Sequence, residues 1–269
     1  MALVLSDITN PFWTTVARGV EDAANKQGYH IIIGNTDESA EKQEEYLLFL
    51  MKKQVDGFLF VPATFKLSNT LQKRRVPYVI LDRRVPSDQV DSVRGDSVGG
   101  AYSLTKHLLE LGHHRMAVIT GRQDHTTACD RVDGYLQALN EAHIRDIQQI
   151  CWGEYNQQSG YDNTVQILQT NPRPTAIFAT NNFIAIGVMR ALRDAGLRVP
   201  EDMSVVAFDD LPAAITIDPF FTVAAQPAYE MGKRATELLL ARLAGNGPEA
   251  FQEIVLPIEI IVRKSSAKI

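Results

Sequence analysis

The fold is decided within the first 34 residues, which read MALVLSDITNPFWTTVARGVEDAANKQGYHIIIG. The ends of this segment, Ala2–Leu5 and His30–Ile33, are short uninterrupted apolar runs, typical of strands covered on both faces in a parallel sheet. The apolar residues between the runs recur every four positions and share one helical face: Phe12, Val16, Val20 and Ala24. Asn10-Pro11 is typical of a helix start, and Gly28 of a helix end. The segment therefore predicts a strand, a helix and a second strand.

The same alternation continues along the chain. Further apolar runs predict strands at Gly57–Val61, Tyr78–Leu81, Met116–Ile119, Ala176–Ala179, Ser204–Phe208 and near Val223. Helical periodicity is expected over 98–111 and around 136–139, 165–168, 188–192 and 238–240. Such alternation implies right-handed crossovers and doubly wound parallel sheets. Because so many elements do not fit comfortably in one sheet, we expect an α/β fold with two lobes of similar size.

The composition excludes several classes of protein. The chain has 269 residues, is 45% hydrophobic and carries a formal net charge of −5, so it lacks the basic field that binds nucleic acid. It has no apolar run near the roughly 18–20 residues that cross a bilayer, and its start has no signal-peptide pattern. Cys129 and Cys151 are expected to be free thiols in a reducing compartment. We therefore expect a cytoplasmic protein.

Sequence motifs for catalysis are missing. The chain has no G-x-G-x-x-G, no G-x-x-x-x-G-K-[ST], no G-x-S-x-G and no H-E-x-x-H motif. The adjacent His113 and His114 are expected to be solvated loop residues and not metal ligands. Asp209 and Asp210 are neighbours whose side chains normally diverge, which gives only weak support to a two-carboxylate glycosidase. We expect no enzyme activity, no catalytic residue, no cofactor and no metal.

Polar and aromatic residues follow the predicted strands, at the carboxyl ends where open α/β sheets bind ligands. They come from six separate loops and supply aromatic faces, carboxylates, guanidinium groups and planar amides: Asn10, Phe12, Trp13, Asp82, Arg83, Arg131, Asn181, Asp209 and Gln226. Such a set suits a polyhydroxylated ring, whose C–H faces lie on aromatic rings and whose hydroxyls need donors and acceptors. We expect the set to converge on one sugar site.

Several of these residues also have a purely structural interpretation. Asn10 could simply cap a helix, and Trp13 could belong to the core. Asp82 and Arg83 could form a surface ion pair worth ~0–1 kcal/mol, and Asp209 could cap the following turn. Taken singly, each residue favours the structural interpretation, whereas six polar strand ends together favour a ligand site.

Six stretches carry linked motifs over essentially the whole chain: Asp7–Trp13, Glu110–Gly121, Arg131–Leu139, Thr180–Leu192, Val199–Asp210 and Glu259–Ser266. Together they resemble the LacI/GalR family of transcriptional regulators. The resemblance implies an effector-binding domain of the periplasmic binding protein type I-like fold, with a ligand cleft between its two lobes. One lobe is then expected at 1–95 plus 227–253, and the other at 96–226 plus 254–269.

The resemblance also implies a role for each candidate residue. The first-strand loop, with Asn10 and its two aromatic residues, would stack against the sugar and hydrogen-bond it. Asp82 with Arg83 resembles the pair used by ribose-type binding proteins, and Arg131 matches an arginine that grips sugar hydroxyls. Tyr155 stands where an aromatic ring closes over the sugar. The remaining polar contacts are matched by Asn181, Asp209 and Gln226.

By this resemblance, sugar binding closes the lobes and changes the affinity of a homodimer for operator DNA. Family members reach DNA through an N-terminal helix-turn-helix headpiece. This chain begins within the first effector-domain strand, so we expect a truncated form in which that headpiece is absent. The effector is expected to be a pentose, a hexose or a sugar acid. The protein is expected to have no membrane partner. The alternative is a periplasmic sugar-binding protein of an ABC transporter, which would share the site but be secreted and monomeric.

Overall fold

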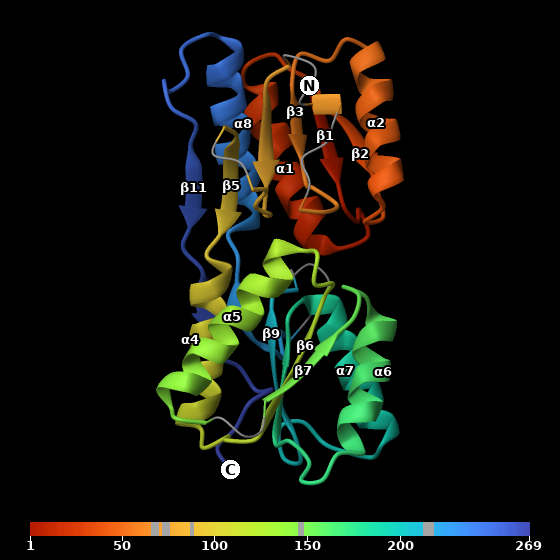
Figure 1. Cartoon of the computed structure of the whole chain (residues 1–269), viewed down its shortest axis with the longest axis vertical. Coiled ribbons are helices and arrows are strands. Elements are labelled where there is room, and N and C mark those ends of the chain that lie inside the picture. The colour runs from red at the N-terminus through yellow and green to blue at the C-terminus, as the bar shows by residue number, and fades with distance from the viewer. Residues whose placement is uncertain (66–69, 72–75, 87–88, 145–147, 212–217) are drawn as a thin grey trace. The chain divides into compact units, whose positions relative to one another are not determined.

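The computed structural model describes residues 1–65, 70–71, 76–86, 89–144, 148–211 and 218–269. The chain divides into two compact units, one formed by 1–95 with 227–257 and the other by 96–226 with 258–269 (Figure 1). The expected division placed the last crossing after residue 253. Strand β11 (Glu253–Leu256) instead pairs in parallel with β5 (Asp91–Gly95), so the chain stays in the first unit up to Pro257.

Each unit contains one six-stranded sheet. The first sheet has the order β11-β5-β4-β3-β1-β2, and its pairs are all parallel. Its remaining strands are β1 (Ala2–Leu5), β2 (Ile32–Asn35), β3 (Phe58–Phe60) and β4 (Tyr78–Leu81). The second sheet has the order β12-β10-β9-β8-β6-β7, with only β12 antiparallel to its neighbour. Its strands are β6 (Met116–Thr120), β7 (Gln148–Trp152), β8 (Ala176–Ala179), β9 (Ser204–Phe208), β10 (Thr222–Ala225) and β12 (Glu259–Ile261).

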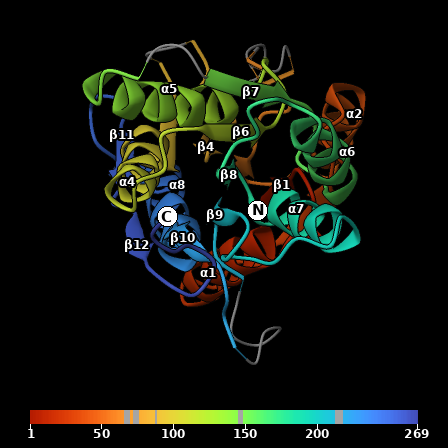
Figure 2. The same cartoon turned by 90° about the horizontal axis from the view of Figure 1, so that it is seen from below.

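Helices follow most strands, as in doubly wound sheets. The first unit contains α1 (Pro11–Asn25), α2 (Ala40–Lys52) and α8 (Ala228–Leu243). The second contains α4 (Ser97–Glu110), α5 (Thr126–Glu141), α6 (Gln157–Leu168) and α7 (Asn182–Asp194). Within the second unit, α4 packs against α5 and α6 packs against α7, as Figure 2 shows. This architecture confirms the predicted α/β fold with two parallel-dominated sheets.

Successive residues of the central strands point to opposite faces of each sheet. Because these residues are apolar on both faces, helices cover both faces. In the first unit, Leu3 of β1 packs in one cluster with α1 and α8, whereas Val4 packs in another with α2. In the second unit, Ile119 of β6 packs with α6 and α7, whereas Val118 packs with α4 and α5. The uninterrupted apolar runs therefore correspond to strands buried on both sides.

Some elements differ from the prediction. The strand expected at His30–Ile33 begins two residues later, because Ile32 to Asn35 pair residue for residue with Ala2 to Leu5. The apolar runs did not reveal α2, β5, β7, β11 or β12, several of which are rich in polar residues. No helix in the described part of the chain combines the length and apolar character needed to cross a membrane.

Candidate functional site

The candidate residues of the first unit follow two strands of its sheet. Asn10, Phe12 and Trp13 come after β1, and Asp82 and Arg83 come directly after β4. Because both strands run in the same direction in a parallel sheet, these residues lie at the same edge of it. All five are buried. The alternative of an exposed surface pair at Asp82 and Arg83 is therefore wrong.

The loop after β1 has a clear structural role. The Asn10 side chain accepts a hydrogen bond from the backbone N–H of Phe12 at 3.0 Å, which caps α1 as its sequence predicted. The rings of Phe12 and Trp13 pack edge to face, with centroids 4.8 Å apart, and both join the core cluster around α1 and α8. Ser6, just after β1, carries a buried hydroxyl without a hydrogen-bond partner among the described residues. The sequence prediction missed Ser6.

Arg83 is held by a residue that sequence reasoning also missed. Its two terminal nitrogens donate to the two carboxylate oxygens of Glu38 at 2.7 and 2.6 Å, and one of them also donates to the Pro62 carbonyl at 2.8 Å. Glu38 lies in the loop after β2 and adopts a left-handed conformation, with φ of 60°. No local sequence pattern marks Glu38, because its partner stands far along the chain.

The five candidate residues of the second unit form one connected group. Arg131 of α5 donates to the Thr180 carbonyl at 2.6 Å, and its nearest nitrogen lies 3.8 Å from a carboxylate oxygen of Asp209. Gln226 donates through Nε2 to Asp209 at 2.7 Å. Residues that are separated by up to 95 positions thus meet at one place. The fold of this unit brings Arg131, Asp209 and Gln226 together. That all the candidate residues converge on one sugar site stays a prediction.

Two aromatic rings lie close to the Arg131 guanidinium. Its central carbon lies 3.8 Å from the ring centroid of Phe208 and 5.9 Å from that of Tyr155. Asn181 ties the group to α7, because its Oδ1 accepts from the backbone N–H of Ile184 at 2.7 Å while its Nδ2 donates to the Tyr155 carbonyl at 3.4 Å. Asn181 therefore caps α7 and also contacts the loop that carries Tyr155.

Two polar atoms of this group are buried without a hydrogen-bond partner among the described residues. They are Nε of Arg131, a donor, and Oε1 of Gln226, an acceptor. Arg131 is only 3% exposed, so its unmade hydrogen bond carries a desolvation penalty. Buried polar groups are nearly always hydrogen-bonded in native proteins, which makes such atoms candidates for contact with a ligand.

Other titratable and polar groups serve the structure. His113, expected in a solvated loop, is instead buried, with Nδ1 2.9 Å from the Thr175 hydroxyl and Nε2 3.0 Å from the Ala267 carbonyl. Burial lowers the pKa of this imidazole. Cys129 and Cys151 are free thiols. Over the residues that the structure describes, no group of three or more His, Cys, Asp or Glu side chains is arranged to hold a metal ion.

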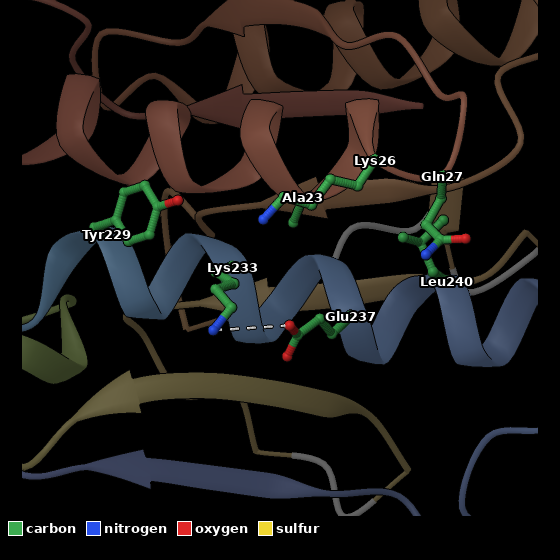
Figure 3. A pocket seen from close by; sticks show the side chains of 7 residues that line it. All are labelled: Ala23, Lys26, Gln27, Tyr229, Lys233, Glu237 and Leu240. Atoms are coloured by element: carbon green, nitrogen blue, oxygen red, sulfur yellow. Dashed lines mark ion pairs between the residues drawn. The ribbon is translucent and has the colours of Figure 1, made fainter.

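A separate surface pocket of the first unit lies over α1 and α8 (Figure 3). It is lined by Ala23, Lys26, Gln27, Tyr229, Lys233, Glu237 and Leu240. Lys233 lies 4.0 Å from Glu237, and the Tyr229 hydroxyl donates to Asp22 at 3.1 Å. Because several of its polar groups already have partners and it contains none of the candidate residues, this pocket is not part of the candidate site.

Known proteins resemble this chain over nearly its full length. Residues 105–266 match the periplasmic binding protein-like domain. The transcriptional repressor PurR of Vibrio atlanticus (strain LGP32) is 36% identical over 247 residues, which cover 90% of this chain and 74% of the repressor. The ribose operon repressor of Halalkalibacterium halodurans is 32% identical over 266 residues, 99% of this chain and 79% of that protein.

A solved structure also resembles this chain over its full length. The crystal structure of a LacI family transcriptional regulator from Enterococcus faecium with bound ribose aligns with a TM-score of 0.88 at 33% identity. The alignment covers 100% of this chain and 99% of that one. Both sheets and their covering helices are therefore shared with a ligand-binding protein.

Proposed function

The chain belongs to the LacI family of transcriptional regulators, and we propose that it forms the effector-binding part of a regulator that responds to a sugar. The observation that carries this proposal is the group of Arg131, Asp209 and Gln226, which presents a buried donor and a buried acceptor with unused hydrogen-bonding capacity. A sugar hydroxyl both donates and accepts, so sugar hydroxyls can satisfy both kinds of atom. The ribose bound to the relative from Enterococcus faecium supports this class of ligand.

We propose a sugar-binding role for the candidate residues of each unit. In the first unit, the Asp82 carboxylate would accept hydrogen bonds from sugar hydroxyls. The loop from Asn10 to Trp13 would supply an amide and apolar ring surface. In the second unit, Tyr155 would add a ring beside Arg131. The support is that each set lies at the carboxyl ends of the strands of its own parallel sheet, where ligands bind in this class of fold.

Sugar binding would be coupled to DNA binding. The sugar favours whichever conformation of the regulator it binds better, and only this difference in affinity can shift the equilibrium. In a regulator that also binds operator DNA, the shift would change operator affinity, and by reciprocity DNA would change sugar affinity by the same factor. We propose that the regulator acts in the cytoplasm, because its relatives are transcriptional repressors. For the same reason we propose that it binds its ligand without catalysing a reaction.

We also propose that the regulator is a homodimer. Large apolar side chains are exposed on β2, the edge strand of the first sheet, and on the neighbouring α2: Ile32, Ile33, Leu48 and Phe49. An exposed apolar edge of this kind is typical of a surface that another chain covers. Sedimentation velocity would decide: a stable dimer supports the regulator, whereas a strict monomer at high concentration would contradict it.

Calorimetric titration with a panel of pentoses, hexoses and disaccharides tests the site. We expect at least one sugar to bind the wild-type chain and the same sugar to lose most of its affinity in Arg131→Ala. The matched control is Arg193→Ala, which removes an exposed guanidinium of the same unit that pairs with its neighbour Asp194. Equal affinity in both variants would remove Arg131 from the site.

A further inference from the structure

Both arginines of the candidate site are already matched by carboxylates. Arg83 uses three of its five N–H donors on the two oxygens of Glu38 and on the Pro62 carbonyl. The pair is buried on the arginine side, where the side chain is 4% exposed, and 21% exposed at Glu38. Because the Glu38 carboxylate binds this guanidinium through both oxygens and balances its charge, Arg83 attracts a second anion only weakly.

The arginine of the second unit is matched in a different way. Arg131 stands 3.8 Å from Asp209, and both side chains are less than a tenth exposed. Nearby, Arg263 binds both carboxylate oxygens of Asp210, at 2.6 and 2.7 Å. Each of these two arginines therefore has a carboxylate at ion-pair distance. The group can still donate hydrogen bonds, since Nε of Arg131 is unused among the described residues.

Neither set carries an excess of positive charge. In the first unit, Arg83 stands with Glu38 and Asp82, a formal total of −1, and in the second, Arg131 stands with Asp209, a formal total of zero. A ligand that carries its own carboxylate or phosphate would add a further negative charge to buried surroundings without an excess cation. Neutral hydroxyls, in contrast, can donate to the aspartates and accept from the arginines.

Resting on the proposed function, we propose that the effector is an uncharged sugar and not a sugar acid or sugar phosphate, and that Glu38 is the specificity-determining residue that sets this preference. Glu38 acts through Arg83: it neutralises and orients a guanidinium that would otherwise attract an anionic ligand. The sequence alone is consistent with both neutral sugars and sugar acids, and the Glu38–Arg83 contact favours the neutral sugars.

The first test uses the wild-type chain and matched ligands. Calorimetric titrations would compare D-glucose with D-glucuronate, D-galactose with D-galacturonate and D-ribose with D-ribose 5-phosphate, with cellobiose as a further neutral sugar; the uronates keep the sugar ring and add only a charge. We expect at least one neutral sugar to bind, and its anionic counterparts to bind about 100-fold more weakly, because placing like charges together in a buried interface is strongly unfavourable. An anionic compound that binds as tightly as its neutral parent would overturn the inference while leaving the proposed function intact. Binding of none of these compounds would overturn the proposed function itself.

The second test isolates Glu38. Glu38→Gln keeps the size of the side chain but removes its charge, so the ratio of anionic to neutral affinity is expected to rise about tenfold or more because Arg83 no longer faces the Glu38 carboxylate. The matched control is Glu41→Gln, which removes an exposed carboxylate from the start of the neighbouring helix and is expected to leave that ratio unchanged. The same ratio in both variants would overturn the role of Glu38. If Glu38→Gln does not fold, the wild-type titrations still decide the ligand class.

Discussion

Asp82 and Asp209 occupy equivalent positions in the two units. Each directly follows the third strand in the order of its sheet, β4 or β9, and each is 7% exposed. The backbone N–H of Asp82 donates to Val93 at 2.9 Å, and that of Asp209 donates to Ala224 at 3.0 Å, so each is tied to the next strand of its sheet. Both adopt a left-handed conformation, with φ of 63° and 65°. The two sheets therefore place a buried carboxylate at the same point by the same backbone device.

The left-handed backbone at Asp82 predicts a difference between two substitutions that both remove the carboxylate. Asp82→Ala is expected to be less stable than Asp82→Gly by about 1 kcal/mol, because only glycine adopts positive φ without a steric cost. Urea denaturation of the two variants measures the difference. The same pair at Asp209 serves as a replicate, and equal stability within each pair would contradict the argument.

Arg131 is expected to be irreplaceable by lysine. Its planar guanidinium lies 3.8 Å from the Phe208 ring centroid while donating to Thr180, and the compact ammonium of lysine cannot reproduce both contacts. We expect Arg131→Lys to weaken sugar binding by about 2 kcal/mol, or roughly 30-fold, in calorimetric titrations. Recovery of wild-type affinity by lysine would show that charge alone is needed.

The Glu38–Arg83 pair also contributes to the stability of the first unit. Removing one partner leaves a buried charge unmatched, so Glu38→Gln is expected to lower the free energy of unfolding by about 2–4 kcal/mol, allowing for the partial exposure of Glu38. The double variant with Arg83→Gln should lose less than the sum of the two single variants, since the second change removes the unmatched charge. Denaturant unfolding of the wild type, the two single variants and the double variant completes this double-mutant cycle. Strictly additive losses of unfolding free energy would argue against an interaction between Glu38 and Arg83.

His113 makes stability depend on pH. Burial is the main cause that lowers the pKa of this imidazole from its ordinary value of 6.5. The unfolded chain therefore takes up a proton at higher pH than the folded chain does. The full contribution is present above about pH 6.5, and it is lost as the pH falls from there toward the lower pKa of the folded state.

A substitution at His113 provides the measurement. His113→Gln keeps hydrogen-bonding capacity toward Thr175 and the Ala267 carbonyl but cannot titrate. Free energies of unfolding, measured between pH 5 and pH 8, should fall less steeply on acidification in this variant than in the wild type. Because burial also lowers the pKa of His107, some dependence on pH will remain. Identical slopes in the two proteins would exclude His113 as a source.

Glycines allow the close approach of α1 and α8 that Figure 3 shows. A Cβ atom added at Gly19 would lie 2.1 Å from the Tyr229 carbonyl oxygen, and one added at Gly232 would lie 2.1 Å from that of Val16. Gly19→Ala is therefore expected to destabilise the chain by about 3 kcal/mol, since backbone must move. Gly28→Ala is the control, because that glycine has φ of 76° but open space around it, so its cost is limited to about 1–2 kcal/mol. Urea denaturation of both variants checks the ranking.

Local sequence patterns were enough to predict the alternation of strands and helices and to single out most of the residues proposed for the site. The apolar run at Ala2–Leu5 and the four-residue spacing after it reflect local geometry, because residues two or four positions apart face the same side of a strand or helix. The cap at Asn10 could be predicted because its hydrogen bond joins residues only two positions apart. The positions of Asp82 and Asp209 directly after strands could also be predicted, because each follows an apolar run in the sequence.

Only the tertiary structure decided which distant residues meet. Strand β5 was missed because it begins with a charged residue, yet Asp91 is buried and receives two hydrogen bonds from Arg242, at 2.7 and 2.9 Å. Glu38 likewise has no signal of its own, because its role arises from the position of Arg83 in a different loop. A buried charge is stable only beside its partner, and which partner stands there depends on the order of the strands, which no local pattern encodes.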